Sequence, residues 1–112
     1  MDCIFCKIAN KEMGTLIYED EKCVAFNDLN PQAPVHILIV PKKHLSTLNE
    51  LDENNKDIIG HLAYTASRIA KEKGLEERGY RIIMNCNGDA GQTVFHIHMH
   101  LLGGKKMKEG LA

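Results

Sequence analysis

The 112-residue sequence lacks a long apolar run, a marked excess of charge of either sign and any internal repeat. Because a membrane-spanning helix needs roughly 20 consecutive apolar residues, we expect no membrane segment. Lysine and arginine number 14 and aspartate and glutamate 15, so the basic surface that grips polymeric nucleic acid is missing. The first residues also lack a positive stretch followed by an apolar signal core. These absences predict a cytoplasmic protein whose partner is a small molecule.

A chain of this length holds enough apolar area for one core, so we expect a single domain over residues 1–112. Without a secretion signal, a reducing compartment favours free thiols or metal binding over disulfides for the four cysteines. Cys3 and Cys6 form a CxxC pair, whereas Cys23 and Cys86 fit no partner pattern and are expected to be spectators.

The spacing of apolar residues predicts two helices and five strands. Ile4, Phe5 and Ile8 have helical spacing near the N-terminus, and a longer apolar stripe predicts a helix over about 54–73 that ends at Gly74. Short turns between the strands, with one long helix, indicate an α+β domain: an antiparallel sheet with helices on one face. The strands are expected at about 16–18, 23–26, 35–40, 80–85 and 94–102, the first two as a hairpin.

The run His96-Ile97-His98-Met99-His100 alternates imidazole with aliphatic side chains. In a strand this pattern puts three histidines on one face, roughly 6–7 Å apart at Cα, where neighbouring rings can share an anion such as phosphate. One alternative is an ordinary solvated strand face. Another is a catalytic metal, since an HxH pair chelates zinc and His36, expected to be buried in the central strand, could supply a third ligand.

The segment before these histidines, Asn85 to Thr93, is rich in glycine and hydrogen-bond donors. Gly91 would let backbone N–H groups point at an anion, and the Asn85 amide and Thr93 hydroxyl could bond phosphoryl oxygens. A plain loop is the alternative, because no Walker-type Lys-Ser/Thr pair follows it.

Residues 91–102 read Gly-Gln-Thr-Val-Phe and then His-Ile-His-Met-His-Leu-Leu. This order of residues resembles the histidine triad (HIT) family of nucleotide hydrolases and transferases. Segments 28–36 and 39–44 are also similar to family segments, in the same order. The pair Gly103-Gly104 resembles the histidine triad nucleotide-binding branch, the purine nucleoside phosphoramidate hydrolases. The resemblance implies a HIT-like fold, a ligand with an AMP or GMP moiety, and a homodimer formed through the long helix and the strand at 80–85. It also implies a phosphoramidase activity on nucleoside 5′-phosphoramidates or related derivatives such as acyl-adenylates.

Carried over to this sequence, the resemblance makes His98 the nucleophile of a covalent nucleotidyl-histidine, with His100 and His36 beside the phosphate and His96 orienting His98. A neutral imidazole, with an ordinary pKa of about 6.5, is nucleophilic at cellular pH. A second, protonated imidazole would stabilise the phosphoryl charge, so catalysis should require no cofactor. The resemblance further implies contacts with the ribose from Asp28 and with the base from Leu29, Phe5, Ile8 and Met13. Asn85, Gly91, Gln92 and Thr93 of the preceding loop are also expected to bind the substrate.

Some bacterial members of the family bind structural zinc with such a CxxC pair and two histidines, which would be Cys3, Cys6, His44 and His96 here. Two buried thiols at helical spacing, or a redox pair, are the alternatives. For the whole protein, the alternatives are a zinc-dependent hydrolase and a nucleotide-binding scaffold whose hydrolysis is incidental. His61, on the long helix, is expected to be a surface or packing residue.

Overall fold

The computed structural model describes residues 3–111. Within them, no helix combines the length and the apolar character that crossing a membrane would require. The helices are α1 (Ile4–Ala9), α2 (Asp57–Glu72) and two 3₁₀ helices, η1 (Leu48–Glu50) and η2 (Gly88–Ala90). The strands are β1 (Tyr18–Glu19), β2 (Cys23–Asn27), β3 (Val35–Pro41), β4 (Tyr80–Ile83) and β5 (Met99–Gly103).

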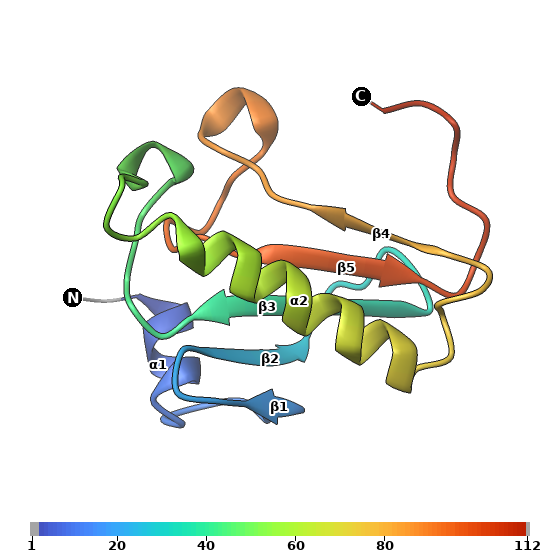
Figure 1. The fold of residues 1–112 in the computed structure, drawn as a ribbon, viewed down its shortest axis with the longest axis horizontal. Coiled ribbons are helices and arrows are strands. Elements are labelled where there is room, and N and C mark those ends of the chain that lie inside the picture. The colour runs from blue at the N-terminus through green and yellow to red at the C-terminus, as the bar shows by residue number, and fades with distance from the viewer. Residues whose placement is uncertain (1–2, 112) are drawn as a thin grey trace.

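The strands form one antiparallel sheet in the order β1-β2-β3-β5-β4 (Figure 1). At its centre, Ile37 of β3 pairs with Asn27 of β2 on one side and with Leu101 of β5 on the other. The predicted α+β class and the five-stranded antiparallel sheet are confirmed.

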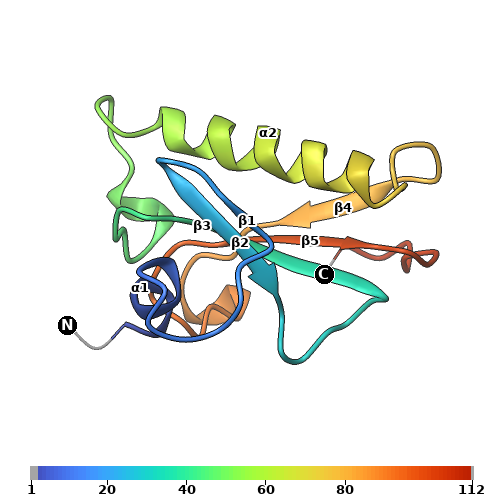
Figure 2. The same ribbon diagram turned by 90° about the horizontal axis from the view of Figure 1, so that it is seen from below.

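The prediction that the helices share one face of the sheet is wrong. Figure 2 shows α2 on one face and α1 on the other. The reason lies in β2 and β3, whose residues are buried on both faces. Ile37 and Ile39 pack toward α2, whereas Leu38 and Val40 pack toward α1. A strand that is apolar on both faces needs cover on both, and the short α1 supplies the second cover.

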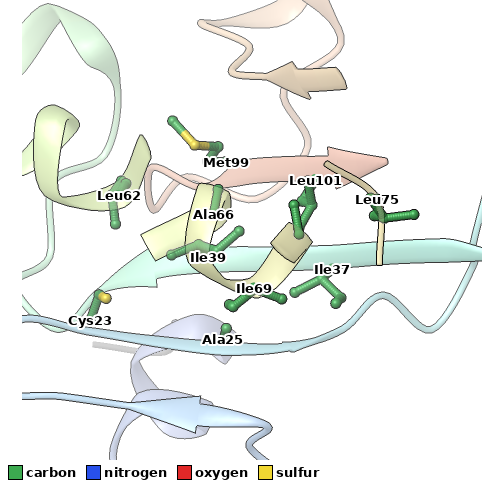
Figure 3. Packing of buried hydrophobic residues seen from close by; sticks show 11 residues of the cluster. Cys23, Ala25, Ile37, Ile39, Leu62, Ala66, Ile69, Leu75, Met99 and Leu101 are labelled. Atoms are coloured by element: carbon green, nitrogen blue, oxygen red, sulfur yellow. The ribbon is translucent and has the colours of Figure 1, made fainter. Parts of the chain in front are cut away.

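The larger core lies between α2 and the sheet (Figure 3). The apolar stripe of α2 buries Leu62, Ala66, Ile69 and Ala70, at the three- and four-residue spacing that predicted the helix. Each fully buried leucine or isoleucine stabilises the fold by roughly 2 kcal/mol. The predicted end of the helix is also confirmed, since Gly74 has a φ of +74° just beyond it.

The fifth strand is shorter than predicted, because β5 begins at Met99 rather than near residue 94. Its ladder with β3 starts at the pair Ile39 and Met99. Continuing it toward the N-terminus of β5 would bring Ile97 opposite Pro41, which has no N–H to donate. Residues 96–98 are instead held by isolated hydrogen bonds outside the ladder, such as the 2.8 Å hydrogen bond from Ile97 N to Leu45 O.

Candidate active site and metal centre

An open cleft of about 490 Å³ lies on the α1 face of the sheet, a size typical of small-molecule sites. Residues from α1, the end of β2 and the segment around β5 form its walls. Among the residues expected in the site, those that line the cleft are Phe5, Ile8, Asp28, Leu29, Thr93, His98 and His100.

His98 has its ring hydrogen placed by the main chain. Its Nδ1 lies 2.9 Å from the carbonyl oxygen of His96, and a carbonyl can only accept, so Nδ1 carries the hydrogen. The Nε2 atom of the neutral ring therefore carries a lone pair. The Phe5 ring packs edge-on against the His98 ring, with 5.0 Å between centroids, and restricts its orientation.

His100 lines the cleft and is hydrogen-bonded to His36, which is not among the described lining residues. Gln32 N donates to His36 Nδ1 (2.9 Å), which places the hydrogen of the neutral His36 ring on Nε2. That atom lies 2.9 Å from His100 Nδ1, so the hydrogen of His100 is on its own Nε2. The rings of His100 and His98 are 5.0 Å apart between centroids. His36 is 5% exposed, as predicted for a central strand.

Burial is the main cause that lowers the pKa of His100 to about 4, and the neighbouring His98 and His36 add to it while Asp28 opposes it. At neutral pH this ring is therefore an uncharged N–H donor. The expectation of a protonated second imidazole does not hold for His100, because a buried site penalises the charged form.

Asp28 lies at the end of β2, on the wall of the cleft. One of its carboxylate oxygens, Oδ1, accepts from Asn30 N (2.8 Å). The other, Oδ2, lies 3.3 Å from His36 Nε2. The turn thus holds the carboxylate beside the imidazoles, where it can also accept from hydroxyl groups of a ligand.

His96 does not share an anion with the other two histidines of the triad, which corrects the expectation drawn from strand alternation. Its side chain is fully buried. The Nε2 atom lies 2.7 Å from the carbonyl oxygen of Pro41, so Nε2 carries the hydrogen and Nδ1 is free to accept. Burial lowers the pKa of His96, although the bond to Pro41 opposes the shift. The part of His96 that meets His98 is its carbonyl group.

The Nδ1 atom of His96 belongs to a cluster with Cys3, Cys6 and His44, whose four donor atoms all lie within 4.8 Å of one another. The sulfur to Nδ1 distances are 3.4 Å for Cys3 to His96, 3.3 Å for Cys6 to His44 and 3.5 Å for Cys6 to His96, and the two Nδ1 atoms are 3.2 Å apart. A tetrahedral zinc ion requires about 3.6 Å between sulfur and nitrogen and about 3.3 Å between nitrogens. The cluster, which we call the four-ligand cluster, therefore fits zinc, and the His96 to Pro41 bond is the outer contact usual for a metal-bound histidine.

The loop before the triad contributes less to the cleft than predicted. Thr93 lines it, but Asn85, Gly91 and Gln92 are not among the described residues that do. Gln92 is 5% exposed, and its amide bonds three backbone groups. The side chain of Gln92 is fully used in these bonds within the loop, so the expected contact with the substrate is not supported for Gln92.

Other cleft residues were missed from the sequence. Strand alternation could have found two of them, since Phe26 lies two residues before Asp28 and Leu38 two residues after His36. Met13, expected beside the base, is 45% exposed and is not among the described lining residues. The remaining missed residues, Ile4, Gly14, Thr15, Asn27 and Val94, gave no pattern of this kind.

Comparison with known proteins identifies this arrangement. The family model of the HIT domain matches residues 10–107. The chain belongs to the histidine triad family. A solved histidine triad protein from Clostridium difficile superposes with a TM-score of 0.95 at 52% identity, covering 98% of this chain and 96% of that one.

Two named relatives bear on the two sites of this histidine triad protein. The 14 kDa zinc-binding protein of Zea mays is 50% identical over 107 residues, 93% of this chain and 83% of its own length. The purine nucleoside phosphoramidase of Escherichia coli (strain K12) is 44% identical over 110 residues, 97% of this chain and 92% of its own length. The predicted family is confirmed, and it is a family of hydrolases.

Proposed function

We propose that this protein hydrolyses purine nucleoside 5′-phosphoramidates, and related derivatives such as acyl-adenylates, through a nucleotidyl adduct on His98. The observation that carries the proposal is the bond from His98 Nδ1 to the carbonyl of His96, which leaves the Nε2 lone pair of a cleft-lining ring free to attack. The named activity of the E. coli relative supports the substrate class.

The reaction would proceed in two displacements at phosphorus. His98 Nε2 attacks the phosphorus, the P–N bond of the substrate breaks, and the amine leaves with a proton. The N–H of His100 and the hydroxyl of Thr93 are the candidate donors in the cleft. Water then attacks the adduct, the bond from phosphorus to Nε2 breaks, and the nucleoside monophosphate leaves. Splitting one hard displacement in this way lowers each barrier.

The walls of the cleft match the parts of a nucleotide. The Asp28 carboxylate can accept from the two ribose hydroxyls, and the apolar side chains Phe5, Ile8 and Phe26 can enclose a base. The hydrogen of His100 on Nε2 can donate to a phosphoryl oxygen, because its Nδ1 is occupied by His36. Leu29, 98% exposed at the rim, can cover a bound base.

We also assign zinc to the four-ligand cluster, held by Cys3, Cys6, His44 and His96. When bound there, zinc would supply structural cross-linking rather than catalysis, because all four of its positions are taken by protein groups. The zinc-binding relative from Zea mays supports this assignment.

The direct test is rapid-quench mass spectrometry of the protein mixed with adenosine 5′-phosphoramidate. We expect a transient mass increase of one nucleotidyl group on the peptide that contains His98. His98→Ala should remove the adduct and lower kcat by at least about 1,000-fold, since the nucleophile is lost. His61→Ala, a histidine on the opposite face of the sheet, is the matched control and should keep full activity. An active His98→Ala variant would refute the mechanism.

A second candidate rests on Asp28, His36 and His100, whose donor atoms lie within 4.8 Å of one another and could hold a catalytic metal. His98 is not part of that group, so this function predicts loss of activity with chelators and recovery with metal. A panel of phosphoramidates and acyl-adenylates, assayed with and without chelator, separates the two. Turnover far below about 1 s⁻¹ on every substrate would instead indicate a binding protein.

A further inference from the structure

A third cluster of metal-ligand side chains lies on the α2 face of the sheet, away from both sites described above. Asp20 comes from the turn between β1 and β2, Cys23 from the start of β2, and His61 from α2. We propose that these three residues, the three-ligand cluster, bind a divalent transition metal ion such as Zn²⁺, with one coordination position open to solvent. The proposal is independent of the hydrolase function.

The donor atoms are close to the spacing that a metal requires. Asp20 Oδ2 lies 2.8 Å from His61 Nε2 and 3.6 Å from Cys23 Sγ, and all three atoms are within 4.8 Å of one another. Zinc bonds of about 2.0–2.3 Å require separations of about 3.3–3.6 Å between ligand atoms. The oxygen to sulfur distance already meets this requirement. The oxygen and nitrogen must separate by about half an ångström, within the reach of small side-chain rotations.

The carboxylate is held in place for this role by outer contacts. Asp20 Oδ1 accepts from the backbone N–H groups of Lys22 (2.7 Å) and Cys23 (2.8 Å), which turns Oδ2 toward α2. Tyr18 donates its hydroxyl to Oδ2 at 2.8 Å. Burial opposes the ionised form, yet these bonds together hold the pKa of Asp20 well below its ordinary value. An ionised, oriented carboxylate with satisfied neighbours is typical of a metal ligand.

An ion could reach the cluster from solvent. The side chains of Asp20 and His61 are 24% and 27% exposed, while Cys23 is fully buried behind them. The imidazole, carboxylate and thiol form a mixed donor set that suits Zn²⁺ and Co²⁺ rather than Ca²⁺ or Mg²⁺. The three protein ligands leave one position for water, in contrast to the closed four-ligand cluster.

Binding requires two proton movements. Without metal, His61 Nε2–H and the Cys23 thiol both face Asp20 Oδ2. Burial raises the pKa of the thiol to about 11, although the nearby Thr65 hydroxyl opposes the shift. On binding, the thiol proton passes to solvent and the His61 hydrogen moves to Nδ1. A coordinated thiol is deprotonated because the cation replaces the proton.

The same contacts could act only as a hydrogen-bonded link between the β1–β2 hairpin and α2. If they form only such a link, substitutions of Asp20, Cys23 or His61 should lower stability but leave the number of metal ions bound per chain unchanged. The number of ions bound per chain therefore separates the two interpretations.

The experiment titrates the chelator-stripped protein with Co²⁺ and measures bound metal by equilibrium dialysis, with the thiolate-to-cobalt absorption band as a second readout. We expect two ions per chain in the unsubstituted protein. In a Cys3→Ser/Cys6→Ser background we expect one ion that keeps a thiolate band. Adding His61→Gln should weaken the binding of that ion at least tenfold. Adding Cys23→Ser should remove the thiolate-to-cobalt band. Tyr64→Gln, on the same helix outside the cluster, is the matched control and should change neither.

One ion per chain in the unsubstituted protein would overturn the proposal, as would a second ion that gives no thiolate band or binds equally well after His61→Gln. If the Cys3→Ser/Cys6→Ser variant does not fold, the protein loaded with one equivalent of Zn²⁺ is titrated with Co²⁺ instead. The second equivalent must then show the band, and its absence overturns the proposal.

Discussion

Main-chain groups decide which nitrogen of each cleft imidazole carries hydrogen. The carbonyl of His96 places the hydrogen of His98, and the N–H of Gln32 sets that of His36, which in turn sets that of His100. In the proposed mechanism, His98 would attack beside a His100 ring that is uncharged at neutral pH, because partial burial lowers the pKa of His100.

Gln92 should contribute to stability more than its place in a loop suggests. Its amide accepts from Asn87 N and donates to Ser46 O and Val94 O. Gln92→Ala leaves these groups without their partner and should lower the free energy of unfolding by roughly 2–4 kcal/mol, measured by urea denaturation. Activity should fall with it, because Thr93 and Val94 line the cleft.

The matched control for Gln92→Ala is Gln32→Ala. The Gln32 amide makes one exposed bond, to Asn30 O, and its bond to His36 comes from the backbone and is kept. This variant should change the free energy of unfolding by less than about 0.5 kcal/mol. Equal losses in the two variants would show that the buried amide of Gln92 has no special role.

His100 should make stability fall as the pH is lowered from about 6.5 toward 4. The unfolded ring has a pKa of about 6.5 and the folded ring one of about 4. Above this window neither state binds the proton. Within it only the unfolded state does, so the free energy of unfolding decreases by about 1–2 kcal/mol between pH 7 and pH 5. Urea denaturation without metal should show a smaller decrease for His100→Asn, and equal decreases would contradict this account.

The short helix α1 belongs to both sites. Phe5 and Ile8 line the cleft, while Cys3 and Cys6, one at its N-cap and one within it, belong to the four-ligand cluster. A helix of six residues is not stable alone, so its position depends on these contacts. His96 adds a second connection, since its ring joins the cluster and its carbonyl holds His98.

Removal of the metal ligands should therefore weaken nucleotide binding at a distance. Cys3→Ser/Cys6→Ser is expected to lower the Tm by about 10 °C or more and to raise the Kd for AMP about tenfold, as α1 loosens. Differential scanning fluorimetry and titration calorimetry measure the two quantities. Cys86→Ser, a cysteine outside the cluster, should alter neither. An unchanged Kd for AMP would show that α1 keeps its position without the metal.

The sheet of the described residues has an exposed apolar edge. β4 ends the sheet, and its Ile82 pairs with Leu101, so Ile82 and Tyr80 lie on the face that α2 covers. Tyr64 of α2, Tyr80 and Ile82 are 61%, 37% and 42% exposed. An unpaired apolar edge strand invites pairing with a second copy. We expect a homodimer through this edge, which would extend the sheet across both subunits.

Ile82→Lys should convert the dimer to a monomer, because burying two lysines at the shared edge leaves their charges unpaired. Sedimentation velocity measures the change in mass. Ile17→Lys serves as control, since Ile17 is 40% exposed beside β1 at the opposite edge and should leave the dimer intact. Dissociation by both variants would point to a general loss of structure instead.

Much of the architecture could be predicted from local pattern. The stripe of α2 and the apolar run of β3 indicated their own type of element, since a backbone of given geometry repeats its side-chain direction every 3.6 or 2 residues. The alternation of the histidine run correctly indicated that His98 and His100 lie on one side and Met99 on the other. The residue types of the CxxC pair and of the histidines likewise limited the chemistry.

The sequence by itself thus determined the elements, the family and the residue types at both sites. Only the tertiary structure decided which side chains meet. It paired His36 with His100 across 64 residues, buried the amide of Gln92 and brought His61 to Asp20. The periodicity of side-chain directions is set by the local backbone, whereas these contacts depend on strand order, register and the face of the sheet that each helix covers. Those are properties of contacts between residues far apart in the chain.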